Sequence, residues 1–261
     1  MSVETANITD ELRDGVLWIT FQRPEARNAL TFDMYERLAE LCSSVPTDGS
    51  VRAVVISGGG GKAFAAGTDM TQFRAFKTDQ DALDYESRID TILEAVERCA
   101  LPTIAAINGA CTGGGGSIAA ACDIRIASAS LKFGFPIART LGNCLAAANL
   151  ARLSELIGAG RVRELIFTAR LIEAQEGLSV GLVSEVLPDE ATLLERAAEL
   201  AAHVGSMAPL TLRATKEAMR RNRAANRVED SDLIVSCYMS HDFRVGMEAF
   251  LAKRKPVWTG K

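Results

Sequence analysis

A run of four consecutive glycines, Gly113 to Gly116, constrains this chain more than any other feature. The apolar run 102–109 before it has the character of a buried strand, and the alanine-rich stretch 118–122 after it favours a helix. A strand that passes through glycines into a helix leaves backbone N–H groups without partners and pointing toward one place. Because glycine has no Cβ, a ligand can approach that backbone closely. The run therefore predicts a binding site for negative charge, either a phosphate or an oxyanion.

Strand-like and helix-like segments alternate through the first half of the chain, which predicts an α/β fold with a mostly parallel sheet. Strands are expected over 12–22, 51–57, 102–108, 124–128 and 131–133. Helices are expected over 32–43, with Thr31 as its cap, and over 79–99. From about residue 145 helices dominate, over 145–156, 161–167, 190–203, 209–220 and 231–251, with one strand over 182–187. We therefore expect a core over residues 1–200 and a helical region over 201–261.

The charge and composition exclude several classes of function. The formal net charge is -4 with no basic stripe for nucleic acid, and no run reaches the ~20 apolar residues that span a bilayer. The 2 histidines and 6 cysteines show no spacing typical of a metal site, and we expect the cysteines to be reduced thiols. The N-terminus lacks the pattern of a signal peptide. We expect a cytoplasmic protein that binds neither nucleic acid nor membrane and holds no metal.

A second glycine-rich strand end, at 58–70, bears on which anion is bound. Its Gly61–Lys62 pair is similar to part of a phosphate-binding P-loop, but that motif needs glycine at Ile56 and Ser or Thr at Ala63. Neither segment fits the pattern of a dinucleotide-binding loop, so nucleoside triphosphates and NAD are disfavoured. A single segment of this kind is more often a tight turn that allows close packing. The prediction of a site therefore depends on the two segments together.

With four further segments, the two glycine segments resemble the crotonase superfamily, the enoyl-CoA hydratase/isomerase family. The matching segments are Arg23–Leu30, Ala63–Asp69, Ile107–Gly115, Cys122–Ala127, Phe133–Pro136 and Ala249–Trp258, in the family's order over nearly the whole chain. The resemblance implies a spiral core of repeated β-β-α units with a helical C-terminal trimerisation region. It also implies a homotrimer or a dimer of trimers, an acyl-CoA thioester as substrate, coenzyme A as part of that substrate, and no permanently bound cofactor.

The same resemblance implies a thioester enolate whose oxygen accepts two backbone N–H groups, by position those of Thr68 and Gly114. Fixed N–H dipoles stabilise charge that develops on this oxygen, and removing one such donor typically costs about 3–4 kcal/mol. Lys253 of a neighbouring subunit is a candidate for a phosphate contact, although a solvated cation at a helix end explains it equally well. Contacts with coenzyme A and the acyl group are implied for Ala26, Arg27, Ala29, Ala66, Gly67, Met70, Thr112, Gly113, Pro136 and Ile137.

The chain departs from the family at both positions that carry the catalytic glutamates of hydratases, where it has Ser117 and Ile137. Serine alone exchanges protons poorly and isoleucine cannot, so hydration by paired glutamates is not expected. Ser117, Asp69, Arg139 and Asn143 are candidates to replace them, and Asp69 is more simply interpreted as a cap or ion-pair residue. Isomerisation or decarboxylation through an enolate, slow hydration, and inert binding of acyl-CoA remain open.

Overall fold

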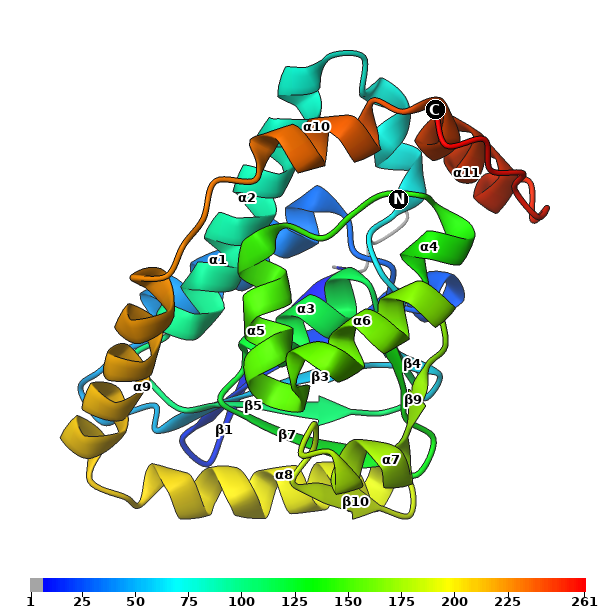
Figure 1. The fold of residues 1–261 in the computed structure, drawn as a ribbon. Helices are drawn as coiled ribbons and strands as arrows, with labels where there is room; N and C mark the ends of the chain where they lie inside the picture. Colours follow the sequence, from blue (N-terminus) through cyan, green and yellow to red (C-terminus); the bar gives the residue numbers. More distant parts are fainter. Residues whose placement is uncertain (1–6) are drawn as a thin grey trace, which may run out of the picture.

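The computed structural model describes residues 7–261, and its strands form two sheets connected by helices (Figure 1). The larger sheet has six strands in the order β1-β2-β3-β5-β7-β10, and the smaller has four in the order β4-β6-β8-β9. Neighbouring strands are parallel except in the pairs β1–β2 and β8–β9. The strands are β1 (Ile8–Arg13), β2 (Val16–Phe21), β3 (Ala53–Gly58), β4 (Ala63–Ala65), β5 (Thr103–Ile107), β6 (Ala110–Thr112), β7 (Ile124–Ser128), β8 (Lys132–Gly134), β9 (Ile172–Glu173) and β10 (Glu185–Leu187).

Helices follow the strand pairs in a repeating order. The strands β3 and β4 are followed by α2, β5 and β6 by α3, and β7 and β8 by α4, with the first strand of each pair in the larger sheet and the second in the smaller. This arrangement confirms the expected α/β fold as a spiral of β-β-α units. The helices are α1 (Phe32–Ser44), α2 (Asp79–Arg98), α3 (Gly114–Ala121), α4 (Ile137–Thr140), α5 (Ala147–Ile157), α6 (Ala159–Thr168), α7 (Ala174–Ser179), α8 (Glu190–Gly205), α9 (Pro209–Ala224), α10 (Ser231–Tyr238) and α11 (His241–Leu251), with 3₁₀ turns η1 (Pro24–Ala26) and η2 (Met70–Ala75).

Alternate residues of the larger sheet face two separate cores, because side chains alternate across a strand. Trp18 of β2 and Val55 of β3 pack in the core formed with α8, whereas Ile19, Val54 and Ile56 belong to the main core with α1, α2 and α3. Figure 1 shows α8 along one face of this sheet and the other three helices on the opposite face. Burial on both faces explains why the first four residues of β3, 53–56, are all apolar.

Several expected elements differ from the structure: α9 extends to Ala224, the strand expected over 182–187 is limited to Glu185–Leu187, and three further elements differ more. The strand expected over 12–22 is the β1–β2 hairpin, whose two-residue turn has both Asp14 (φ 51°) and Gly15 (φ 78°) in the left-handed region. The single helix expected over 231–251 is divided into α10 and α11, because Ser240 caps α11 and its hydroxyl accepts from the Phe243 N–H (2.9 Å). The helix expected at 118–122 begins earlier, at Gly114, so most of the glycine run forms its first turn.

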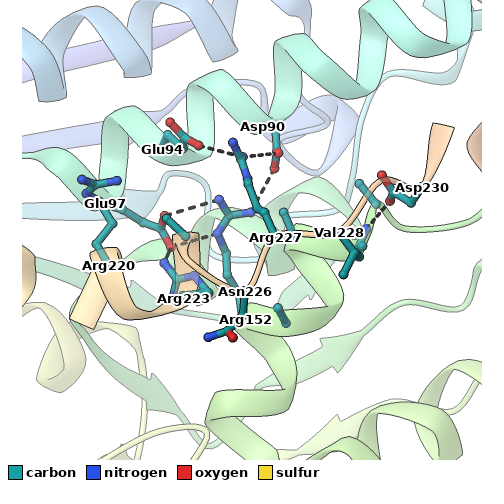
Figure 2. A pocket seen from close by; sticks show the side chains of 15 residues that line it. Asp90, Glu94, Glu97, Arg152, Arg220, Arg223, Asn226, Arg227, Val228 and Asp230 are labelled. Carbon is teal, nitrogen blue, oxygen red and sulfur yellow. Dashed lines mark hydrogen bonds and ion pairs between the residues drawn. The ribbon is translucent and has the colours of Figure 1, made fainter. Parts of the chain in front are cut away.

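A cluster of ion pairs joins the C-terminal helices to the core (Figure 2). Arg152 of α5, whose side chain is 3% exposed, pairs with Glu97 (2.8 Å) and Asp90 (3.2 Å) of α2. Arg223 of α9 pairs with the same Glu97, and Arg227 pairs with Asp90 (2.7 Å). These groups line a cleft, but their charges neutralise one another. We therefore interpret this cleft as a structural joint and not as a binding site.

Three further features concern membrane spanning, metal binding and the state of the cysteines. In residues 7–261 no helix is at once long and apolar enough to cross a bilayer. The same part of the chain holds no group of three or more histidine, cysteine, aspartate or glutamate side chains that could bind a metal ion. The cysteines are free thiols, and Cys42, Cys99, Cys111 and Cys122 are buried.

Candidate active site

The two glycine segments meet at the ends of β4 and β6, which are neighbours in the smaller sheet. A Cβ on Gly113 would lie 3.4 Å from the Cα of Gly67, so the two backbones are in contact. Leu30 holds one segment in place: its N–H donates to the Gly67 carbonyl and its own carbonyl accepts from the Asp69 N–H, both at 2.8 Å. Because successive amides of an extended segment point to opposite sides, the N–H of Thr68 points away from Leu30.

Thr68 and Gly114 line one cavity, and neither backbone N–H donates a hydrogen bond to another residue within 7–261. Gly114 begins α3, and the first N–H groups of a helix have no partner inside the helix. Gly113 (φ 52°, ψ −124°) turns the chain into this helix with a conformation that favours glycine. Two N–H groups and a helix N-terminus therefore border the same space, which favours negative charge there.

Buried hydroxyls fix the position of the Thr68 segment. A Cβ on Gly114 would lie 1.8 Å from the Tyr35 hydroxyl, so a larger residue does not fit without a shift. The Tyr35 hydroxyl is 2.9 Å from Thr68 Oγ1, which is 3.1 Å from the Tyr85 hydroxyl. Burial raises the pKa of both Tyr35 and Tyr85, so both phenols stay neutral. This chain of hydroxyls ties α1 and α2 to the loop that carries Thr68.

Most of the residues predicted to contact the substrate line this cavity. Ala26, Arg27 and Ala29 do not line it, but they lie in the adjoining segment, where the Arg27 carbonyl accepts from the Ala66 N–H (3.1 Å). Lys253 is exposed beyond the end of α11. Contacts of these four residues with coenzyme A stay predictions. The predicted residues that line the cavity are Ala66, Gly67, Met70, Thr112, Gly113, Pro136 and Ile137.

Two of the four candidate acid–base residues lie outside the cavity. Asp69 caps η2 through the Thr71 N–H (3.1 Å) and pairs with Arg23 (3.2 Å). Burial acts to raise the pKa of Asp69, but its bonds with Thr71 and Arg23 outweigh that effect and lower it. Arg139 is exposed on α4. The structure therefore favours the cap and ion-pair interpretation of Asp69 and leaves Arg139 without a contact in the cavity.

Ser117, Asn143 and Ile137 do line the cavity. Ser117 is buried in α3, and its hydroxyl donates to the Gly113 carbonyl at 3.4 Å, a long hydrogen bond. The Asn143 amide donates to the Tyr238 hydroxyl (3.1 Å), and its buried Oδ1 has no partner among residues 7–261. Ile137 is buried at the start of α4. Ser117 and Asn143 can thus orient a bound molecule by hydrogen bonds, but neither is an effective acid or base near neutral pH.

Glu86 is the residue that sequence reasoning missed. Among the described residues that line the cavity, it carries the one carboxyl group, and its exposed fraction is 7%. The available signal was its place on the apolar stripe of α2, between Ala82 and Ile89, where a charged residue is uncommon. Burial raises the pKa of Glu86 from 4.5 to about 7, although a hydrogen bond from Tyr238 opposes the change.

Known proteins share this architecture. The sequence profile of the enoyl-CoA hydratase/isomerase family matches residues 11–261. The chain is 34% identical over 257 residues to the short-chain-enoyl-CoA hydratase of Clostridium acetobutylicum, covering 97% of both chains. It is 34% identical over 250 residues to the human mitochondrial Delta(3,5)-Delta(2,4)-dienoyl-CoA isomerase, covering 92% of this chain and 75% of that one. A structure of methylmalonyl-CoA decarboxylase with 2-nitronate-propionyl-CoA superposes with a TM-score of 0.85 at 26% identity, covering 98% of this chain and 99% of that one.

The spiral of β-β-α units and the paired glycine segments define the crotonase fold. The chain belongs to the enoyl-CoA hydratase/isomerase family, because the family profile matches nearly its whole length and a relative with 34% identity is covered almost completely.

Proposed function

We propose that this protein transforms acyl-CoA thioesters through an enolate whose oxygen is bound by the backbone N–H groups of Thr68 and Gly114. The observation that carries the proposal is a pair of amides on one cavity, neither of which donates a hydrogen bond to another described residue. Negative charge that develops on the thioester oxygen would meet fixed dipoles that need no reorganisation, and each such donor is typically worth about 10²–10³ in rate. Membership of the family supports an acyl-CoA thioester as the substrate.

The cavity favours reactions that need little carboxylate help. Hydration of a double bond requires one group to position or activate water and another to deliver a proton, and Ser117 and Ile137 supply no such pair. Isomerisation and decarboxylation both proceed through an enolate with fewer proton-transfer groups. We therefore place these two reactions ahead of hydration.

A second candidate function is binding of acyl-CoA without turnover. It is favoured by the same observation at 117 and 137, because neither a serine nor an isoleucine side chain exchanges protons effectively near neutral pH. Such a protein would keep the cavity and the two amides while performing no chemistry.

Exchange of α-protons distinguishes the two candidates. Butyryl-CoA is incubated with the purified protein in D2O and followed by NMR, beside the same reaction without protein. We expect deuterium to enter the α-position faster with protein, because the amides stabilise the enolate that exchange requires. A parallel panel of crotonyl-, 3-hexenoyl-, 3-hydroxybutyryl- and methylmalonyl-CoA identifies the reaction. Binding by calorimetry without exchange or turnover of any of these esters would contradict the first candidate and support inert binding.

The C-terminal helices support the expected assembly into a trimer or a dimer of trimers. Leu210 and Met219 on α9, Leu233 on α10 and Phe250 on α11 are large apolar side chains that are exposed in the single chain. We infer that a neighbouring subunit covers part of this surface.

A further inference from the structure

The cavity contains a carboxyl group from an unexpected element. Glu86 comes from the middle of α2, far in sequence from the segments that supply the two amides. It is 7% exposed and has no ion-pair partner among residues 7–261. A buried carboxyl group without a cation is costly, so it is uncommon unless other interactions or a functional requirement retain it.

The contacts of Glu86 leave one of its oxygens available to the cavity. The Tyr238 hydroxyl of α10 donates to Oε1 (2.5 Å), and the Asn143 side chain donates to that same hydroxyl (3.1 Å). Within residues 7–261 no group donates to Oε2, and this oxygen is not fully enclosed by protein atoms. The carboxyl group is thus oriented through one oxygen, while the other is open to a further contact in a residue that lines the cavity.

The groups around Glu86 keep it near the midpoint of its titration. Burial acts first to raise its pKa, the hydrogen bond from Tyr238 lowers it, and the charges of Asp90 on α2 and Asp230 before α10 raise it further, to about 7. The other titratable groups that line this cavity are Tyr35, Tyr85, Tyr238 and Cys144, all of which hold raised pKa values and stay neutral. Both forms of Glu86 are therefore populated at neutral pH, which suits a group that accepts and returns a proton.

Helix α2 connects Glu86 with the proposed oxyanion site. Tyr85, the preceding residue, places its hydroxyl 3.1 Å from Thr68 Oγ1. The ring of Tyr85 lies 5.9 Å from the ring of Tyr238, centroid to centroid. One helix therefore contacts Thr68, a residue of the proposed oxyanion site, and, one position later, carries the carboxyl group that lines the same cavity.

We propose that Glu86 is the catalytic residue that carries the proton in this site, and that the substrate is an acyl-CoA with a β,γ double bond. This inference rests on the proposed function. The Glu86 carboxylate takes a proton from the α-carbon, and the electron pair of that C–H bond forms a dienolate whose negative charge lies on the thioester oxygen, beside the N–H groups of Thr68 and Gly114. The protonated Glu86 then returns the proton to the γ-carbon, and the double bond ends between the α- and β-carbons.

This reaction needs a single acid–base group and no co-reactant, because the proton removed is the proton returned. It therefore matches a cavity in which the described residues supply one carboxyl group. In the same scheme Tyr238 is a positioning residue, since it contacts the carboxyl group and not the reacting atoms.

The test compares Glu86→Gln with the wild type and with Glu94→Gln. Glu94 lies on the same helix but outside the cavity, in ion pairs with Arg98 and Arg227. The substrate is 3-hexenoyl-CoA, and formation of the conjugated 2-enoyl thioester is followed by absorbance. We expect Glu86→Gln to lower kcat by about 10²–10⁴-fold with KM changed less than about threefold. We expect both kcat and KM of Glu94→Gln to stay within about threefold of the wild-type values.

The pH profile gives a readout that a purely structural role would not produce. The reaction begins with the carboxylate, so wild-type kcat/KM should fall about tenfold per pH unit below an apparent pKa near 7. Tyr238→Phe removes a hydrogen bond that favours the charged form, so the midpoint of this decline should move to higher pH. This shift also decides the role of Glu86 if Glu86→Gln does not fold.

The possible failures are distinguishable. Wild-type protein that exchanges butyryl-CoA protons, with Glu86→Gln retaining exchange and isomerisation within threefold, would overturn the role of Glu86 and leave the proposed function intact. An unchanged midpoint in Tyr238→Phe would also count against that role. Wild-type protein that exchanges or converts none of the esters would remove the proposed function itself. Turnover of other esters but not of 3-hexenoyl-CoA would overturn the β,γ-unsaturated substrate.

Discussion

At Gly114 the absence of a side chain decides whether the proposed oxyanion site can form. The nearest atom to an added Cβ is the Tyr35 hydroxyl oxygen, and the next is Tyr35 Cζ at 3.1 Å. The severe conflict is therefore with one buried oxygen, which also forms the hydrogen bond to Thr68 Oγ1, itself 3.2 Å from the added Cβ. Gly114 and Thr68, which are far apart in the sequence, are thus coupled through the Tyr35 hydroxyl oxygen.

We expect Gly114→Ala to destabilise the protein by about 1–3 kcal/mol and to lower turnover, because overpacking displaces the segment that carries the amide. In Gly114→Ala/Tyr35→Phe the clashing oxygen is absent, so part of the lost stability should return. Urea unfolding of both single variants and the double variant measures this coupling. Strictly additive losses would show that the Tyr35 hydroxyl is not the obstacle.

The single residues also show how far sequence patterns reach into the site. Asp69 follows a predicted strand end, and the preferred interpretation as a cap or ion-pair residue agrees with its contacts to Thr71 and Arg23. Glu86 was visible in the sequence only as a carboxylate on an apolar helix face. What lies opposite that face depends on Tyr238, 152 positions later, which local periodicity does not predict.

At the scale of elements, length determined what the sequence could predict. The long helices α1 and α2 have caps and amphipathic periods, and both were predicted to within a residue of their observed ends. The strands β4 and β6 have three residues each, too few to show alternation, and were not predicted. Those two short strands are the elements that bring the glycine segments together.

The division between α10 and α11 depends on one cap. We expect Ser240→Ala to lower the free energy of unfolding by about 1 kcal/mol, because the Phe243 N–H loses its acceptor. Ser236→Ala, on the exposed face of α10, is the matched control and should change stability by less than about 0.5 kcal/mol. Thermal unfolding of the two variants measures both losses of stability. Equal unfolding midpoints for Ser240→Ala and Ser236→Ala would contradict the assigned cap.

At the scale of the whole molecule, the ion-pair cluster of Figure 2 connects α2, α5 and α9. Its central members are buried, with side-chain exposures of 3% for Arg152 and 8% for Glu97. Removing one partner from such a pair leaves an uncompensated charge in a place that water reaches poorly. The cluster therefore holds α9 against α2 and α5.

We expect Arg152→Met to destabilise the protein by up to about 3–5 kcal/mol, since Glu97 and Asp90 lose their shared buried cation and keep only the more exposed Arg223 and Arg227. Arg98→Met removes the exposed pair with Glu94 and should cost less than about 1 kcal/mol. Denaturant unfolding at matched ionic strength compares the two. A small and strongly salt-dependent loss in Arg152→Met would show that the cluster behaves like a surface pair.

The sequence by itself determined the family, the alternating α/β architecture and the two backbone segments of the site, because glycine runs, caps and apolar periods are local properties. Tertiary structure alone decided that Thr68 and Gly114 line one cavity and that Asp69 forms an ion pair with Arg23. It also placed Glu86, Tyr238 and Asn143 in contact at one wall of that space. The physical reason is that hydrogen bonds and burial act between neighbours in space, and the pairing of short strands and the packing of helices set those neighbours.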